Sequence, residues 1–546
     1  MSVLADTGLH PFDYAIIALY MLVMLGIGFK LSKTQNTSEE FFVGERQMPW
    51  WAVGMSMIAT LMSTLTYLGG PGEIILHGMS ITLALIGTPI AFLVVGYLWV
   101  PFFMQLRLTS AYEYLDLRFG SGTRWLAVII YLYMRFIWMG AIIFTASVAI
   151  AQMTQATAPG ALATLSGGKI NIDAETWLYV VILSNGIITT IYTALGGIKA
   201  VIWTDVLQFI CLFLGAVATI VVIGVQTGSG PVDWITEVTS SSHQLPPLFS
   251  WDLSARTTIV GVILAGVTWN ILTHCSDQVA LQRYFTTSSA ANARKVAAVN
   301  YVLDATMQIL LGLVGAALLY YYIRHINELP AGVTDPRDPR FSDKIFPHFI
   351  EHGLPIGISG LVIAAIFAVA QSSLDSGINS TTTVIVVDII RKRKPLTDRE
   401  ELRTAQTLTV IIGTLITVVG VLFTRYPQNQ NIIDLQMKSF NCVLGPLGAI
   451  FMAGILLPHV GGKTALISGF LGLICGLIMG YIDVVAAQFQ VELATVSPFM
   501  LIPVSWLITF TTAALLGGFM PAPRPEQVRG LTWQSVRRGE KHEVIR

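Results

Sequence analysis

The sequence predicts an all-α integral membrane protein that forms one transmembrane domain over residues 1–546. Of the 546 residues, 54% are apolar and only 12% are charged, which fits lipid rather than water as the main solvent. Apolar runs of helical length recur along the whole chain, and only helices or closed barrels satisfy the backbone in a bilayer. No stretch combines a charged surface, core periodicity and a linker, as a separate soluble domain requires.

Thirteen runs approach the roughly 20 apolar residues that a helix needs to cross a bilayer core of about 30 Å. The first run follows an uncharged start and lacks a cleavage pattern, so we expect it to be retained. The cysteines lie inside apolar runs without the spacing of disulfides or zinc ligands, which indicates packing. The predicted spans are 13–32, 50–70, 79–103, 125–153, 177–195, 200–226, 257–276, 296–323, 354–390, 405–424, 432–458, 464–485 and 498–519.

The distribution of Lys and Arg predicts the orientation of these spans. Loops on one side, with the tail 522–546, carry about 23 of these residues, and loops on the other side carry about 7. The N-terminus is therefore expected outside and the C-terminus inside. The basic run 391–394 is interpreted as a topology signal, with a lipid or partner site as the alternative. The zero net charge indicates no nucleic-acid partner, and no obligatory protein partner is indicated.

Two spans read as broken helices. The second contains Ser63 and Thr64 and runs into the glycine-rich segment 69–72, and the seventh ends in the polar segment 273–277. They lie five spans apart, and transporters built from two inverted five-helix repeats place broken helices at corresponding positions. The predicted organisation is an extra helix 13–32, repeat one 50–226, repeat two 257–458, extra helices within 464–519 and a cytoplasmic tail 522–546.

The ninth span carries a polar face. Ser372, Ser373, Ser376, Asn379 and Ser380 recur at intervals that place many of them on one side of a helix. Hydroxyls, together with carbonyls freed by a broken helix, suit Na⁺, a small hard cation that prefers oxygen ligands. Small polar residues that pack two helices together are the alternative interpretation.

Several motifs resemble one known family. They are SEEFFVGERQMPWW at 38–51, YTALGGIKAVIWTDVLQ at 192–208, SDQVALQR at 276–283, the serine face, and GPLG at 445–448. From about residue 12 to 519 the chain resembles the sodium/solute symporters, which include glucose, iodide, monocarboxylate, vitamin and sialic acid carriers. The resemblance implies a LeuT-like fold of 5+5 inverted repeats in the plasma membrane. It also implies solute import coupled to Na⁺ by alternating access, without an organic cofactor.

The resemblance also implies ion ligands. The main Na⁺ site would take carbonyls from Ala59, Met62 and Val369 and hydroxyls from Ser372 and Ser373.

A second group would serve a second Na⁺ or the coupling. Asp205 matches a family acid, and Asp375 stands at a second-site hydroxyl position beside Ser376. Asp375 could strengthen a cation site, admit a proton or form an ion pair, and these readings stay open.

The implied solute cavity lies beside the broken helices. Within the fourth span, Arg135 offers a fork of donors that matches a carboxylate. The alternative is that Arg135 or Lys438 pairs internally with Asp205, Asp375 or Asp304. The remaining candidates are hydrogen-bonding or aromatic residues, of which His274 is more often a packing residue. They are Ser63, Thr64, Thr66, Tyr67, Trp269, His274, Gln436 and Phe440.

The segment 61–69 is similar to the carboxylate and sialic acid carriers, and the Asn and His of the sugar branch are replaced near Leu61 and Thr66. We therefore expect a small organic anion as the solute, with a neutral sugar or polyol as the alternative. A membrane sensor derived from this fold is the alternative of another class. The sequence offers no metal-spaced His cluster, nucleophile elbow or phosphate-binding loop, so an enzyme is not expected. Broken helices suit an occluding site better than a channel.

Overall fold

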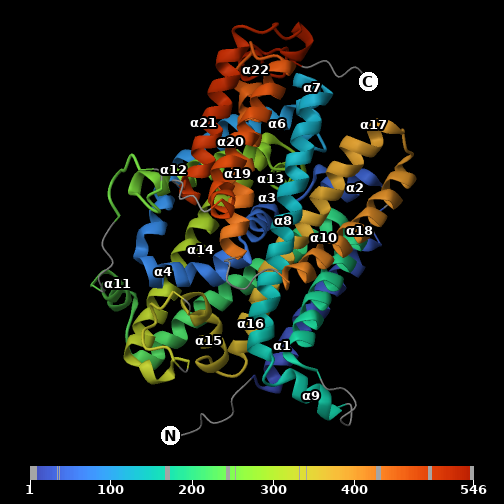
Figure 1. The fold of residues 1–546 in the computed structure, drawn as a ribbon. Helices are drawn as coiled ribbons and strands as arrows, with labels where there is room; N and C mark the ends of the chain where they lie inside the picture. The colour runs from blue at the N-terminus through green and yellow to red at the C-terminus, as the bar shows by residue number, and fades with distance from the viewer. Residues whose placement is uncertain are drawn as a thin grey trace.

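The fold is given by a computed structural model (Figure 1). The structure describes residues 9–33, 35, 37–165, 172–240, 246–252, 254–330, 332–339, 341–425, 432–489 and 495–541. Within these ranges every regular element is a helix, and eleven helices are long and apolar enough to cross a membrane. The predicted all-α membrane fold is therefore confirmed.

The long helices follow the predicted spans but start or end up to about two turns away. Hydropathy detects only the apolar part of a helix, whereas capping residues extend it into the polar layer. Thr397, for example, caps α18 ahead of its apolar stretch. Ten of the eleven are α1 (Pro11–Ser32), α8 (Ser121–Thr154), α10 (Ala174–Thr227), α12 (Ile259–Ser276), α14 (Ala290–Arg324), α16 (Ile358–Val384), α18 (Asp398–Phe423), α19 (Ile432–Leu456), α20 (Gly462–Gln488) and α21 (Pro498–Gly517). The eleventh is the segment Leu65–Gln105, which consists of several shorter helical elements in succession.

Shorter helices cap, join or continue the long ones. They are α2 (Ser38–Val43), α3 (Trp50–Leu61), α4 (Gly70–His77), α5 (Thr88–Val94), α6 (Val100–Gln105), α7 (Ala111–Phe119), α9 (Ala158–Leu165), α11 (Pro231–Ser240), α13 (Gln278–Phe285), α15 (Ile345–His352), α17 (Arg391–Arg393) and α22 (Trp533–Arg537).

The helical element α10 folds back on itself at Gly197. This residue has φ 51° and ψ −154°, a conformation that is far easier for glycine than for other residues. Tyr192 and Thr204 both contact Asp375, although a straight helix would hold them about 18 Å apart. α10 therefore supplies two neighbouring segments, which correspond to the predicted spans 177–195 and 200–226.

Two membrane segments are broken at extended residues. α3 ends at Leu61 and is followed by Met62, where ψ is 120°. The chain resumes through a π-helical turn at Leu65–Gly69 that leads into α4. α12 ends at Ser276 and is followed by Asp277, where ψ is 121°, before the chain continues as α13. Each segment therefore runs beyond the predicted end at 70 or 276. The first break lies in the second predicted span, and the other lies at the end of the seventh, in the polar segment 273–277 that the sequence indicates.

α16 lies at the centre of the bundle, where it packs against α1, α3, α8 and α10. In the most apolar stretch of this segment 89% of the residues are buried, whereas in the most apolar stretch of α1 only 17% are buried. Small residues allow this close packing, since a side chain at Gly377 would collide with Met139 of α8. The serine face of α16 is therefore directed at protein rather than at lipid.

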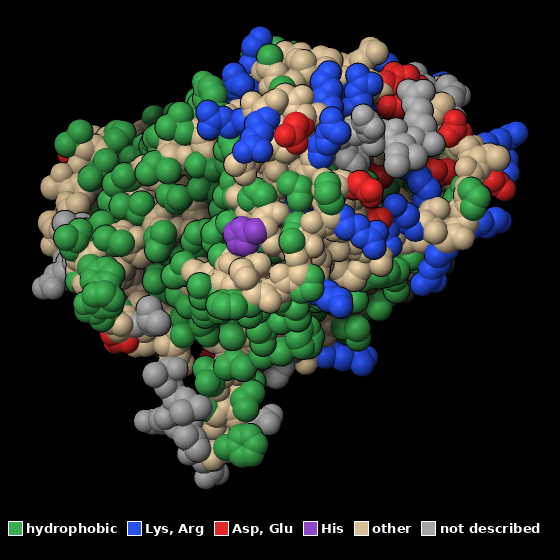
Figure 2. All heavy atoms as spheres, turned by 90° about the horizontal axis from the view of Figure 1, so that it is seen from above, with side chains coloured by type: hydrophobic (Ala, Val, Ile, Leu, Met, Phe, Trp, Pro, Cys, Tyr) green, Lys and Arg blue, Asp and Glu red, His purple; other side chains and the backbone are tan. Residues whose placement is uncertain are grey.

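The two ends of the bundle differ in charge. α9 and α15 lie at one end, and α7, α17 and α22 lie at the other (Figure 1). Figure 2 looks onto the second end, where Lys and Arg side chains gather while hydrophobic side chains cover the flank. This is the end that the charge count predicts to be cytoplasmic. The assignment of each end to a side of the membrane stays a prediction, as do the repeat boundaries.

Candidate functional site

The break after α3 leaves its last carbonyls in need of partners outside the helix. The extended Met62 interrupts the intrahelical pattern, so these oxygens cannot all be paired locally. Ser372 Oγ lies 2.8 Å from the carbonyl oxygen of Ala59. Ser373 Oγ lies 3.0 Å from the Thr60 carbonyl and 3.2 Å from the Met62 carbonyl. The unwound end of α3 therefore faces the two serines of α16.

The same two serines complete an oxygen-rich cluster. Ser372 Oγ is also 3.1 Å from the carbonyl of Val369, and both serines are 0% exposed. Each hydroxyl thus has two carbonyl oxygens within 3.2 Å but only one proton to donate. A small cation would relieve this surplus of lone pairs, and the carbonyl end of α3 adds partial negative charge. The structure brings all five predicted Na⁺ ligands together, with the Thr60 carbonyl beside them.

A charged cluster lies next to this oxygen cluster. Arg283 Nη2 donates to Asp205 Oδ2 at 2.9 Å, and Ser56 Oγ donates to the same oxygen at 2.5 Å. Arg283 also donates through Nε to Ser56 at 2.9 Å and contacts the hydroxyls of Thr60 and Ser376. Asp205 is 0% exposed, so the guanidinium supplies the charge that a buried carboxylate needs. Asp205 Oδ1 has no hydrogen-bond partner within the described ranges.

Asp375 lies beside this cluster and is surrounded by hydroxyls. Its Oδ2 accepts from Tyr192 at 2.8 Å and from Thr204 at 3.5 Å, and its Oδ1 accepts from Ser376 at 3.1 Å. Ser376 in turn lies 2.8 Å from Thr60 Oγ1. The structure therefore brings Asp205, Asp375 and Ser376 into one network, as the sequence suggests.

Arg135 is buried and paired internally. Its Nη2 donates to Asp277 Oδ2, and both side chains are 1% exposed. The guanidinium carbon lies 4.6 Å from the ring centroid of Trp138. The rings of Trp138 and Phe440 of α19 are neighbours, with their centroids 6.5 Å apart. The internal pairing considered from the sequence is thus present, but with Asp277 as the partner.

The three acids named as internal partners were the wrong ones. Asp205 pairs with Arg283, Lys438 pairs with Asp483, and Asp304 accepts from Gln308 at 2.8 Å. The actual partners lie across helix contacts that a single sequence does not reveal.

The other solute candidates are distributed unevenly. Ser63 and Thr66 lie 3.4 Å apart at the break, whereas the Tyr67 hydroxyl donates to the Leu212 carbonyl of α10 at 3.3 Å. Thr64 Oγ1 is buried without a hydrogen-bond partner in the part of the chain that the structure describes.

Two further candidates lie on α12, and a third is on α19. His274 Nδ1 lies 2.7 Å from the Tyr284 hydroxyl, and its ring packs 5.4 Å from that of Tyr301, which supports the packing reading. Trp269 is half-buried. The side chain of Gln436 lies outside the described residues.

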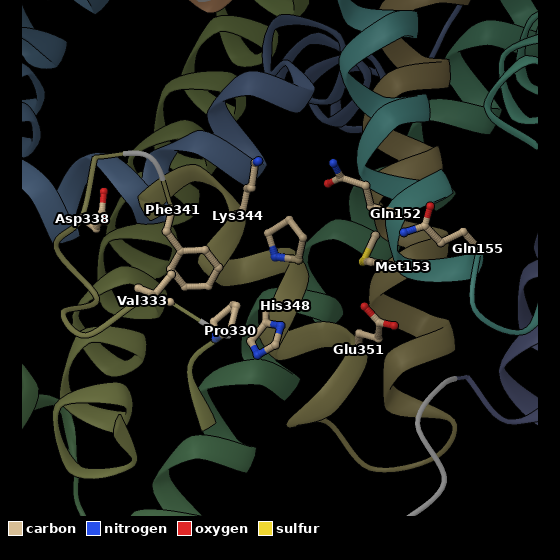
Figure 3. Close-up of a pocket in the computed structure, with 12 residues that line it drawn as sticks. Gln152, Met153, Gln155, Pro330, Val333, Asp338, Phe341, Lys344, His348 and Glu351 are labelled. Atoms are coloured by element: carbon tan, nitrogen blue, oxygen red, sulfur yellow. The ribbon is translucent and has the colours of Figure 1, made fainter. Parts of the chain in front are cut away.

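A cavity of about 530 Å³ has no lining residue on either broken segment, although its wall at Lys344 packs next to α4 (Figure 3). It opens at the end of the bundle that holds α9 and α15, between the end of α8 and α15. Gln152, Lys344, His348 and Glu351 are among its polar lining residues. None of the predicted solute residues lines it.

Comparison with known proteins identifies the family. A family model described as the sodium:solute symporter family matches residues 41–472. The chain belongs to the sodium:solute symporter family. The sodium/sialic acid symporter SiaT of Proteus mirabilis is 29% identical to this symporter over 89% of the chain and 92% of the relative. The corresponding symporter NanT of Aliivibrio fischeri is 30% identical over 83% of the chain and 85% of the relative.

A solved structure of a Na⁺-coupled sialic acid symporter, in a substrate-bound outward-open state, matches the fold with a TM-score of 0.78. It shares 25% sequence identity, and the match covers 94% of this chain and 99% of that one. The two chains therefore share one architecture throughout, so the predicted LeuT-like fold of this symporter is confirmed.

Several contacts of the site were not predicted from the sequence. Arg283 lies in the loop between the predicted spans 257–276 and 296–323, but its side chain is 1% exposed and pairs with Asp205. The feature of the sequence that could have indicated a role for Arg283 is its place at the end of the 276–283 motif. Ser56, Tyr192 and Asp277 join the site through contacts between helices, which a single sequence does not specify.

Proposed function

We propose that this symporter imports a small organic anion together with Na⁺ by alternating access. The observation that carries the proposal is the meeting of the paired serines of α16 with the carbonyls of the broken α3. An uncharged set of oxygens binds a monovalent cation weakly, so the ion can enter from high concentration and leave at low concentration. Na⁺ is the coupling ion that the family implies.

Binding of Na⁺ would replace hydrogen bonds between α3 and α16 with ion contacts. In the described state Ser372 and Ser373 direct their protons at backbone carbonyls. With Na⁺ present, these protons turn away because the hydroxyl lone pairs must face the ion. The ion then holds the unwound carbonyls and the serine pair together, which orders the break where the solute is expected. Solute and Na⁺ should therefore increase each other's affinity by the same factor.

Arg135 is the proposed anchor for the solute carboxylate. Its guanidinium is fixed against Trp138, and Phe440 extends this aromatic surface. A buried guanidinium discriminates strongly for anions because an unpaired charge in the membrane interior is costly. The similar sialic acid symporters make an acidic sugar the first solute to test. Ser63, Thr64 and Thr66 at the break would then supply hydrogen bonds to its polar groups.

The charged cluster is proposed to couple ion and solute rather than to hold a second Na⁺. Arg283 already contacts Asp205 and Ser376, so it provides positive charge at that place. Thr60 contacts Ser373 through its carbonyl and Ser376 through its hydroxyl, which links this cluster to the Na⁺ ligands. Asp375 extends the network to Tyr192 on α10.

Uptake into proteoliposomes tests the function. The purified protein is supplied with radiolabelled N-acetylneuraminic acid, lactate, glucose or a polyol, with Na⁺ or K⁺ outside. We expect Na⁺-dependent accumulation of at least one acid. Uptake of only a neutral solute would support the alternative of a sugar or polyol carrier. Binding without accumulation would support a sensor.

A further inference from the structure

The ion pair between Arg135 and Asp277 joins α8 to the break between α12 and α13. Asp277 is the extended residue of this break, and its Oδ1 accepts from the Val279 backbone N–H at 3.0 Å, which caps α13. Only Oδ2 is engaged with Arg135. The internal carboxylate therefore divides its two oxygens between a helix cap and the guanidinium.

The guanidinium of Arg135 is incompletely used in this pair. Its Nη2 contacts Asp277, whereas Nε is buried and has no hydrogen-bond partner among the described residues. An Arg side chain can donate two parallel hydrogen bonds to a carboxylate whose two oxygens are both free. A carboxylate on a solute can therefore satisfy Arg135 better than Asp277 does.

We infer that Asp277 is an internal competitor for the solute carboxylate, and that it occupies Arg135 until an anionic solute displaces it. The inference rests on the proposed import of an organic anion. Two carboxylates beside one guanidinium repel each other strongly at low dielectric, so solute binding separates Asp277 from Arg135. A neutral solute lacks the charge to do this, which makes Asp277 a determinant of specificity.

Displacement of Asp277 also loosens the break. The residues that flank it are tied to α7, because the Tyr112 hydroxyl donates to the Ser276 carbonyl at 3.2 Å and the Ala111 N–H donates to Gln278 Oε1 at 2.7 Å. The ion pair adds a direct link from this joint to α8. Its loss leaves the contacts of α12 and α13 with α7 and removes this ionic link to α8, so recognition of the anion becomes a change in helix contacts.

Removal of the competing charge should increase affinity. The apparent affinity of a site is reduced by the fraction of molecules in which the site is free, so an occupied Arg135 weakens solute binding. Asn at position 277 can still cap α13 but carries no charge. We expect Asp277→Asn to lower the Kd for an acid by about tenfold.

Equilibrium binding to the purified full-length protein in detergent with Na⁺ measures this Kd. The probes are radiolabelled N-acetylneuraminic acid and lactate. Asp277→Ser also retains a capping hydroxyl and serves if Asp277→Asn does not fold. Asp483→Asn is the matched control, because it removes the acid of another interhelical pair, Lys438–Asp483, and should leave the Kd unchanged.

The outcomes separate the two proposals. A lower Kd in Asp277→Asn or Asp277→Ser, with binding lost in Arg135→Ala, supports the inference. An unchanged or higher Kd in the Asp277 variants overturns it, while loss of binding in Arg135→Ala still supports the proposed anion carrier. If the unsubstituted protein binds and imports only neutral solutes, the proposed function fails and the inference fails with it.

Discussion

Thr60 connects the two polar clusters at the scale of single residues. Its carbonyl lies 3.0 Å from Ser373 Oγ, and its hydroxyl lies 2.8 Å from Ser376 Oγ and contacts Arg283. Any shift of the α3 end that accompanies Na⁺ binding therefore reaches the Arg283–Asp205 pair. The sequence indicated the serines, since membrane helices rarely carry such a face without a reason. It could not indicate this link, because a threonine in an apolar segment has no distinctive pattern.

The buried pair of Asp205 and Arg283 should be strongly coupled. Asp205→Asn leaves a buried guanidinium without its counter-charge, and we expect a loss of about 3–5 kcal/mol in stability. Arg283→Met leaves the carboxylate unpaired at a similar cost. Thermal unfolding in detergent measures both, and the double variant should lose much less than the two single losses combined.

The pair Lys438–Asp483 provides the control for this comparison of single and double variants. Its side chains are 23% and 34% exposed, so solvent screens the charges and each single substitution should cost no more than about 1 kcal/mol. The account would be contradicted if the double variant lost as much stability as the two single variants together, and if each single loss were as small as in this control. The two residues would then not depend on each other.

The elements show which part of the fold is predictable. Hydropathy located the long helices, and glycines and polar residues located the two broken segments, because lipid forces apolar runs into helices. The exact break was not predictable, since Met62 is an ordinary apolar residue and its contact with Ser373 joins two helices far apart in the sequence. The pairing of Arg135 with Asp277 likewise arises only when the folded bundle brings α8 to the break after α12. Local sequence thus predicts elements, and tertiary contacts decide the partners.

The fold-back of α10 should depend on Gly197. The backbone at this position has a positive φ, and a Cβ added here would lie 2.9 Å from the carbonyl oxygen of Phe41. We expect Gly197→Ala to cost about 1–3 kcal/mol and to lower the yield of folded protein. Gly26→Ala in α1 is the control, since nothing lies within 4 Å of its Cβ. Size-exclusion profiles and thermal unfolding compare the two variants, and equal stability would argue against a strained turn.

The whole molecule should sit in the membrane with its basic end inside. We expect a membrane-impermeant maleimide to label Val232→Cys in intact cells, because α11 lies at the predicted outer side and Val232 is 78% exposed. Lys394→Cys should react only after the cells are permeabilised. Both variants are made in a background without the native cysteines. The reverse labelling pattern would mean that the predicted orientation is wrong.

The central claim is that Ser372 and Ser373 bind the Na⁺ that drives transport, and the Na⁺ dependence of solute uptake tests it most directly. Loss of one oxygen ligand should raise the Na⁺ concentration for half-maximal uptake by about tenfold in Ser372→Ala or Ser373→Ala, equivalent to about 1.4 kcal/mol. Ser468→Ala on α20 is the control, because this buried hydroxyl bonds only within its own helix among the described contacts. An unchanged Na⁺ dependence in both α16 variants would contradict the account.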